Sequence, residues 1–155
     1  MALKIGDKAP DFKLLNTEMK EITLSGLAGK NVVVLFFPAA FTGVCTAELC
    51  QTRDNIAFYS NLNATVVGIS VDLPFSLAKF KEEQKLPFDL LSDFNKTTSQ
   101  AYDSFYANWI LGLNGVAKRS AFVLNGEGNV VYAEVLESAG DMPNFDAVNA
   151  ALQAI

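Results

Sequence analysis

Two cysteines, Cys45 and Cys50, are the residues of this 155-residue chain best suited to chemistry, and they stand five positions apart. The chain contains no histidine, which excludes Ser-His-Asp triads, Cys-His proteases and most transition-metal sites. Two cysteines without histidine also cannot supply the four ligands of a structural zinc site. The remaining readings are thiol redox chemistry or an inert core thiol.

Cys45 ends a short segment, Pro38-Ala39-Ala40-Phe41-Thr42-Gly43-Val44, which leads from an apolar run into a helical pattern. The apolar run Asn31–Phe37 lacks alternation, which predicts a strand buried on both faces. Sites in open α/β sheets form at the carboxyl ends of strands, and a helix N-terminus stabilises a thiolate. We therefore expect a reactive Cys45, with the Thr42 hydroxyl pointing at its sulfur and Pro38 limiting access of water.

The rest of the chain predicts the elements that must position this segment. A turn signal at Asn125-Gly126-Glu127-Gly128 predicts a hairpin, and a further short strand is expected before it. Strands are predicted at Phe12–Leu15, Glu21–Thr23, Thr65–Val71, Ser120–Leu124 and Val130–Val135, and helices at Thr42 to about Asn61, Pro74–Gln84, Thr97–Tyr102 and Asn144–Ala154. This order predicts an α/β, thioredoxin-like fold: a central mixed β-sheet flanked by helices on both faces, with an N-terminal β-hairpin. One domain is expected over residues 1–155.

Composition narrows the classes of partner. Half of the residues are hydrophobic and 19% are charged, as in an ordinary globular protein and unlike a disordered chain. Twelve basic against 17 acidic residues give a net charge of −5, which argues against a nucleic-acid partner. The apolar run Val32–Phe37 is too short to cross a bilayer, and the N-terminus lacks the apolar core of a signal peptide. No membrane partner and a cytoplasmic location are expected.

The pattern Pro38-x-x-x-Thr42-x-x-Cys45 resembles the active-site signature of peroxiredoxins, the thiol peroxidases. Glu48 follows the cysteine by three residues, and Arg119 stands just before the strand Ser120–Leu124, where this family places its catalytic arginine. The opening Gly6-Asp7-Lys8-Ala9-Pro10-Asp11-Phe12 is also similar to the family's usual start. The resemblance covers essentially the whole chain.

The resemblance implies a mechanism without metal, haem or flavin. The Cys45 thiolate attacks one peroxide oxygen and becomes a sulfenic acid. Arg119, Thr42 and the Cys45 backbone N–H stabilise the developing charge, while Glu48 holds the guanidinium in place. Hydrogen peroxide, organic hydroperoxides and peroxynitrite all remain open as substrates.

Cys50 has two readings. On one ideal helix the two Cα atoms are about 8.7 Å apart, beyond the roughly 7 Å that a disulfide tolerates, so bonding requires unwinding. The same helix directs Cys45 toward the body of the protein and Cys50 toward a mostly polar face. The spacing resembles the Q-type peroxiredoxins (bacterioferritin comigratory proteins), in which the second cysteine resolves the sulfenic acid and thioredoxin or a similar dithiol reduces the disulfide. The motif Phe36–Cys45 is closer to the AhpE-like one-Cys group, which implies an external thiol and a bystander Cys50.

Other readings stay open beside these. Thr42 can be a simple helix N-cap, and we expect Arg53 to be structural. A thioredoxin-type disulfide oxidoreductase is disfavoured by the C-x-x-x-x-C spacing, and a non-enzymatic holdase or binding module has no residue in its favour. The aromatic segment Tyr102–Ala117 suits either a dimer surface or the core, so a monomer and a homodimer are both compatible with the sequence.

Overall fold

The computed structural model describes residues 3–155 and is built around a mixed sheet of seven strands. The strand order is β2-β1-β5-β4-β3-β8-β9, and β6 and β7 form a separate two-stranded ribbon. The strands are β1 (Lys13–Asn16), β2 (Glu21–Thr23), β3 (Asn31–Phe36), β4 (Ala64–Ser70), β5 (Asp89–Ser92), β6 (Phe105–Tyr106), β7 (Val116–Ala117), β8 (Ser120–Leu124) and β9 (Val130–Val135). The α-helices are α1 (Gly43–Asp54), α2 (Ile56–Asn61), α3 (Pro74–Gln84), α4 (Thr97–Ala101) and α5 (Phe145–Gln153), and short 3-10 turns lie at Ser25–Leu27 and Ile110–Gly112.

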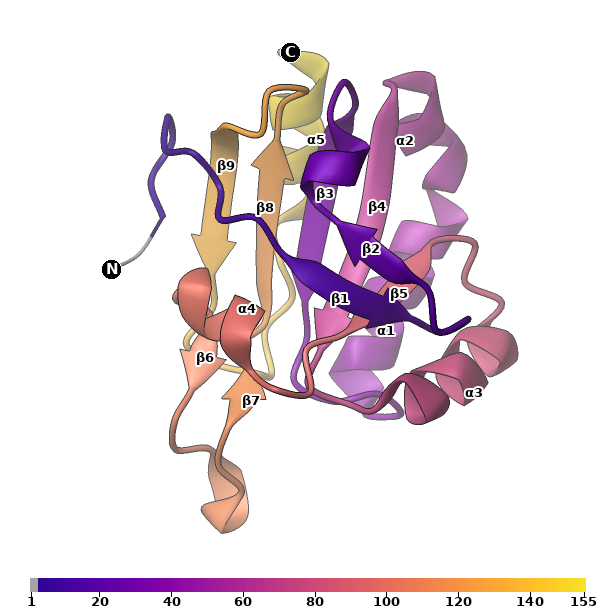
Figure 1. Cartoon of the computed structure of the whole chain (residues 1–155), viewed down its shortest axis with the longest axis vertical. Helices are drawn as coiled ribbons and strands as arrows, with labels where there is room; N and C mark the ends of the chain where they lie inside the picture. The colour runs from indigo at the N-terminus through magenta and orange to yellow at the C-terminus, as the bar shows by residue number, and fades with distance from the viewer. Residues whose placement is uncertain (1–2) are drawn as a thin grey trace.

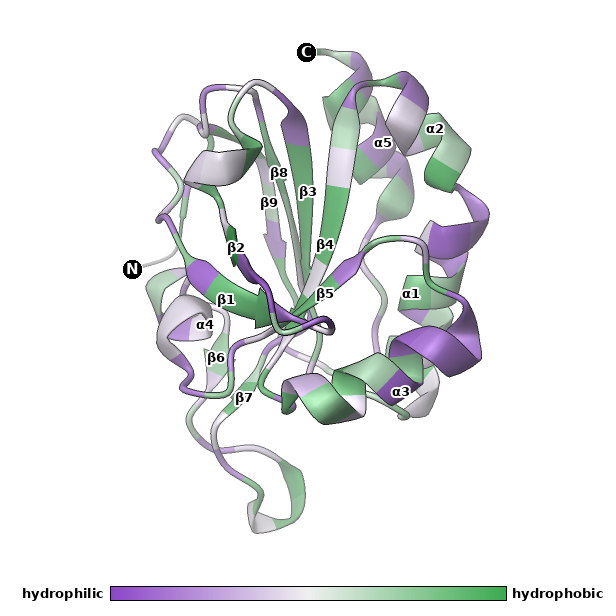
Figure 2. Cartoon of the chain, turned by 45° about the vertical axis from the view of Figure 1, so that its right-hand side comes forward, coloured by the Kyte–Doolittle hydropathy of each residue, from purple (hydrophilic) through white to green (hydrophobic). Residues whose placement is uncertain are grey.

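Strand β3 lies at the centre of the sheet and supplies side chains to two hydrophobic cores. It runs parallel to β4 and antiparallel to β8. Val33 and Leu35 face the core beneath α1, α2, α3 and α5, whereas Val34 and Phe36 face the core beneath β1, the N-terminal segment and the turn after α4. Burial on both faces explains the unbroken apolar run in this strand, and Figure 2 shows hydrophobic colouring along the central strands.

The predicted fold class is confirmed. The sheet is mixed, helices lie on both of its faces, and β1 and β2 form the N-terminal hairpin (Figure 1). The last hairpin turns at Asn125, whose side-chain oxygen accepts the N–H groups of Glu127 and Asn129. None of the helices within residues 3–155 is both long enough and apolar enough to cross a membrane.

The prediction of a single long helix from Thr42 to about Asn61 is wrong, because two helices occupy this segment. Helix α1 ends at Asp54, and α2 starts at Ile56. Asn55 between them has φ −110° and ψ 16°, outside helical geometry, and its side-chain amide donates to the Gln51 carbonyl. Asn competes for backbone hydrogen bonds in this way and so favours helix ends over helix interiors.

The ribbon of β6 and β7 is a second difference from the sequence-based prediction. It projects beyond the sheet at the lower end of Figure 1, on the side where β3 and β4 end. Its strands have two residues each, too few for an alternating pattern to be recognised. After β7 the chain enters β8 with Ser120 opposite Phe36, the last residue of β3. This register brings the start of β8 to the carboxyl end of β3, where the candidate site lies.

Candidate active site

Cys45 lies in the first turn of α1, directly beyond the carboxyl end of β3. Its side chain is 1% exposed and packs in the same core as Phe37 and Leu49, so the prediction that it faces the body of the protein is confirmed. The first N–H groups of a helix have no intrahelical partner, and the helix dipole favours negative charge at that end. The sulfur therefore combines a backbone environment suited to a thiolate with exclusion of bulk water.

Arg119 contacts both other members of the predicted cluster. Its Nη2 atom donates to Cys45 Sγ at 3.2 Å, and its Nη1 atom donates to Glu48 Oε1 at 2.8 Å. The Arg119 and Glu48 side chains are 2% and 0% exposed. Cys45 and Glu48 are three residues apart on one helix and so project from neighbouring positions of the same face. The structure thus brings these three predicted residues together in one buried cluster of a thiol, a carboxyl and a guanidinium.

A fourth group in this cluster, the backbone carbonyl of Ala139, is one that sequence reasoning missed. It accepts hydrogen bonds from Arg119 Nη2 at 2.9 Å and from Nε at 3.2 Å. Ala139 lies in the loop between β9 and α5, and the neighbouring Leu136 N–H donates to the Arg119 carbonyl. A backbone acceptor carries no side-chain signature, so no residue type in the sequence could have indicated it. Two acceptors and the sulfur together fix the guanidinium plane.

Burial dominates the electrostatics of Glu48. Loss of solvent raises the pKa of its carboxyl to about 8, although the charge and hydrogen bond of Arg119 act in the opposite direction. Its second oxygen, Oε2, has no hydrogen-bond partner among the described residues, as befits a carboxyl whose ionised form is poorly compensated. Burial by itself lowers the pKa of Arg119, but the neighbouring Glu48 and Cys45 raise it by more, so the pKa lies above its ordinary value. The guanidinium therefore stays charged.

The segment Pro38–Thr42 connects β3 to Cys45. Pro38 is buried, whereas Thr42 is exposed and its hydroxyl donates to the Ala39 carbonyl at 2.8 Å. The expectation that this hydroxyl points at the sulfur is therefore not met in this conformation, because the loop carbonyl already accepts its proton. Thr42 occupies the N-cap position without a side-chain cap bond, and its part in peroxide binding stays a prediction.

Cys50 lies on a different side of α1 and is half-buried, and neither cysteine is in a disulfide. Its thiol donates to the side-chain oxygen of Gln84, the last residue of α3, at 3.3 Å. Arg53 Nη1 donates to the backbone carbonyl of the same Gln84 at 2.6 Å. Arg53 thus satisfies a carbonyl at the end of α3, which agrees with the structural role expected for it. Cys50 is held against α3 and is less open than a polar helix face implies.

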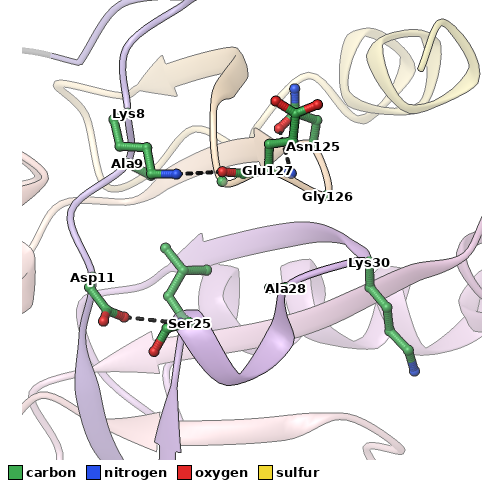
Figure 3. A pocket seen from close by; sticks show the side chains of 11 residues that line it. Lys8, Ala9, Asp11, Ser25, Ala28, Lys30, Asn125, Gly126 and Glu127 are labelled. Carbon is green, nitrogen blue, oxygen red and sulfur yellow. Dashed lines mark hydrogen bonds between the residues drawn. The ribbon is translucent and has the colours of Figure 1, made fainter.

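A cavity of about 240 Å³ lies at the opposite end of the sheet from Cys45. The N-terminal segment, the turn before β3 and the β8–β9 turn line it (Figure 3). Lys8 Nζ donates to the Glu127 carbonyl, and the Ser25 N–H donates to Asp11 Oδ1. These two pairs of polar groups at its wall are thus bonded to each other, and none of the residues that line the cavity belongs to the thiol cluster.

Comparisons with known proteins agree with this geometry. The sequence model of the AhpC/TSA family matches residues 5–133. The chain is 38% identical to alkyl hydroperoxide reductase E of Mycobacterium tuberculosis over 136 residues, 86% of each chain. It is 32% identical to peroxiredoxin Bcp of Bacillus subtilis, covering 92% of this chain and 98% of the relative.

The fold is also similar to that of solved structures. The crystal structure of peroxidoxin BcpB from Mycobacterium tuberculosis superposes with a TM-score of 0.87 and 33% identity, over 99% of this chain and 98% of the other. Both the sequence and the structure matches therefore extend over the cluster of Cys45, Glu48 and Arg119.

Proposed function

Because the chain belongs to the AhpC/TSA family of peroxiredoxins, we propose that its thiol peroxidase activity runs through Cys45 as the attacking thiolate. The observation that carries this proposal is the 3.2 Å hydrogen bond from Arg119 Nη2 to Cys45 Sγ. A buried guanidinium is permanently charged and aimed at the place where negative charge develops. Hydrogen peroxide and organic hydroperoxides are the proposed substrates, because the reaction needs only an accessible O–O bond.

The first step forms an S–O bond and breaks the O–O bond. The Cys45 sulfur takes one oxygen and becomes a sulfenic acid, while the other oxygen leaves with the electron pair and a proton as water or an alcohol. The Arg119 guanidinium and the Cys45 backbone N–H stabilise the charge on the departing oxygen. Glu48 and the Ala139 carbonyl hold the guanidinium in the geometry that this requires.

Pro38 and Thr42 belong to the same proposal. Pro38 is buried in the loop between β3 and α1, and in this proposal it keeps water from the sulfur. The Thr42 hydroxyl exchanges its bond to the Ala39 carbonyl for one to the peroxide when substrate enters. The carbonyl lies within the same loop, so this exchange needs only a side-chain rotation.

We further propose that Cys50 resolves the sulfenic acid. The Cys50 sulfur attacks Cys45 Sγ, the S–O bond breaks, and water leaves as the disulfide forms. Both cysteines lie within helix α1, so the helix start must unwind first, since a spacing of five on a helix puts the Cα atoms about 8.7 Å apart. A dithiol such as thioredoxin then returns both thiols with two electrons.

Intact mass spectrometry tests the proposal. The reduced protein is quenched seconds after one equivalent of hydrogen peroxide. Loss of two hydrogens is expected and supports Cys50 as the resolving residue. Gain of one oxygen would instead indicate a one-Cys cycle with an external thiol, and an unchanged mass would overturn Cys45 as the peroxidatic residue for this substrate. Cys50→Ser should convert the first outcome into the second, and Cys45→Ser should abolish both.

A further inference from the structure

The Phe37 N–H at the start of the loop between β3 and Cys45 donates to the Ile69 carbonyl of β4, but the next residues of the loop have few hydrogen bonds to other parts of the chain. Pro38 has no N–H group, and the Thr42 hydroxyl bonds within the loop. The Ala40 N–H donates to Asp72 Oδ2 at 2.9 Å. Within residues 3–155, this is the one hydrogen bond that joins Ala39–Phe41 to a different element. The position of the loop beside Cys45 therefore depends strongly on one carboxylate.

Asp72 is itself held by buried serines at the ends of two strands. Ser70 Oγ donates to Asp72 Oδ2 at 2.7 Å and accepts the Asp72 N–H at 3.2 Å. Ser92 Oγ donates to the Asp72 carbonyl at 2.6 Å. Ser70 and Ser92 are 0% and 8% exposed. These contacts orient the carboxylate toward Ala40 before any substrate arrives, which is the arrangement expected of a positioning group.

The loop conformation that Asp72 holds is an unfavourable one. Phe41 has φ +66°, a left-handed conformation that bulky side chains rarely adopt and that persists only when its surroundings hold it. Its ring is half exposed and packs edge-on against Phe80, with the ring centroids 5.1 Å apart. When the Asp72 bond breaks, this conformation can relax, and Gly43 at the start of α1 is the next residue but one.

We propose that Asp72 is a positioning residue that holds the loop closed for attack on peroxide and whose release permits the start of α1 to unwind. The closed loop keeps Pro38 and Thr42 beside Cys45, and so speeds sulfenic acid formation. The released loop lets Cys45 approach Cys50, and so speeds the attack of the Cys50 sulfur that expels water and forms the disulfide. The second half rests on the proposed resolving role of Cys50.

The test measures the two rates separately in Asp72→Ala, with rapid quenching and intact mass. Sulfenic acid formation should slow by about tenfold, because misplaced reacting groups lose much of their rate. Disulfide formation should speed up by about fivefold, the factor for one lost hydrogen bond. Asp72→Asn should keep both rates within about twofold of wild type, because its amide oxygen still accepts from the Ala40 N–H. Glu83→Ala, which removes an exposed carboxylate on α3, is the matched control.

Opposite shifts of the two rates distinguish this role from general loss of structure, which would slow both. The proposal would be overturned if both rates were unchanged in Asp72→Ala. It would also be overturned if Asp72→Ala and Asp72→Asn slowed sulfenic acid formation equally. If the wild-type protein forms no disulfide, the resolving role of Cys50 fails, and the rate of sulfenic acid formation still decides whether Asp72 positions the loop. Ser70→Ala should shift both rates in the same directions as Asp72→Ala but less, because it loosens the carboxylate without removing it.

Discussion

Arg119 donates a hydrogen bond to the sulfur of Cys45, 74 positions earlier in the chain, at 3.2 Å. The two residues come from different elements: Cys45 from the first turn of α1 and Arg119 from the residue before β8. The antiparallel pairing of β8 with β3, with Ser120 opposite Phe36, brings them together. The positive charge beside the Cys45 sulfur is therefore placed there by the topology of the sheet.

Replacing Arg119 by Lys should lower kcat/KM for hydrogen peroxide by about 100-fold, because one ammonium cannot reach the sulfur, Glu48 and Ala139 as the planar guanidinium does. Steady-state turnover with a dithiol reductant measures this. Arg53→Lys is the control, since Arg53 contacts the end of α3 and not the sulfur. A loss below threefold in Arg119→Lys would contradict the assigned role.

Glu48 should make stability depend on pH. Burial raises the pKa of Glu48 to about 8 in the folded protein, from an ordinary value of 4.5. The folded state therefore binds the extra proton between these values, and its stability decreases as pH rises through them, by up to about 1.4 kcal/mol for each pH unit. In Glu48→Gln this dependence should disappear.

Urea unfolding from pH 4 to pH 9 measures the effect as the difference in unfolding free energy between wild type and Glu48→Gln. The contributions of the other titrating groups cancel in this difference. The difference should fall across the window and level off above about pH 8, where Glu48 is ionised in both the folded and the unfolded state. A difference that stays constant or rises with pH would contradict a raised pKa for Glu48.

Gln84→Ala should accelerate disulfide formation by about fivefold, because it removes the acceptor that holds the Cys50 thiol against α3. It should also reduce over-oxidation of Cys45 to sulfinic acid at excess peroxide, since the sulfenic acid is resolved sooner. Gln51→Ala, a change of the exposed neighbour of Cys50, is the control. Equal rates in Gln84→Ala and wild type would show that this contact does not limit resolution.

Gly68→Ala should destabilise the core beneath the site. A Cβ atom on Gly68 would meet Leu90 Cδ2 at 2.8 Å and Phe37 Cε1 at 3.3 Å. Overpacking of this kind should lower the free energy of unfolding by about 1–3 kcal/mol, as measured by urea denaturation. Gly43→Ala is the comparison, because its Cβ meets nothing within 4 Å, and stability should stay equal or rise slightly.

The sequence by itself predicted the fold class and three members of the thiol cluster. Strand β3 is recognisable because its side chains are buried on both faces, so its apolar run is unbroken. Cys45 could be found from its place between a strand end and a helix start, whereas Glu48 and Arg119 were indicated by the resemblance to the peroxiredoxin signature. Cys45 and Glu48 were also predicted to share a helix, where a spacing of three makes them neighbours.

Only the tertiary structure decided which groups complete the site. The Ala139 carbonyl is a backbone atom and has no signature in the residue type. Asp72 and Gln84 are ordinary polar residues until the sheet places one beside Ala40 and the α1–α3 packing places the other beside Cys50. These contacts join residues 20 to 34 positions apart, and local patterns carry no information on them because they depend on how the elements pack.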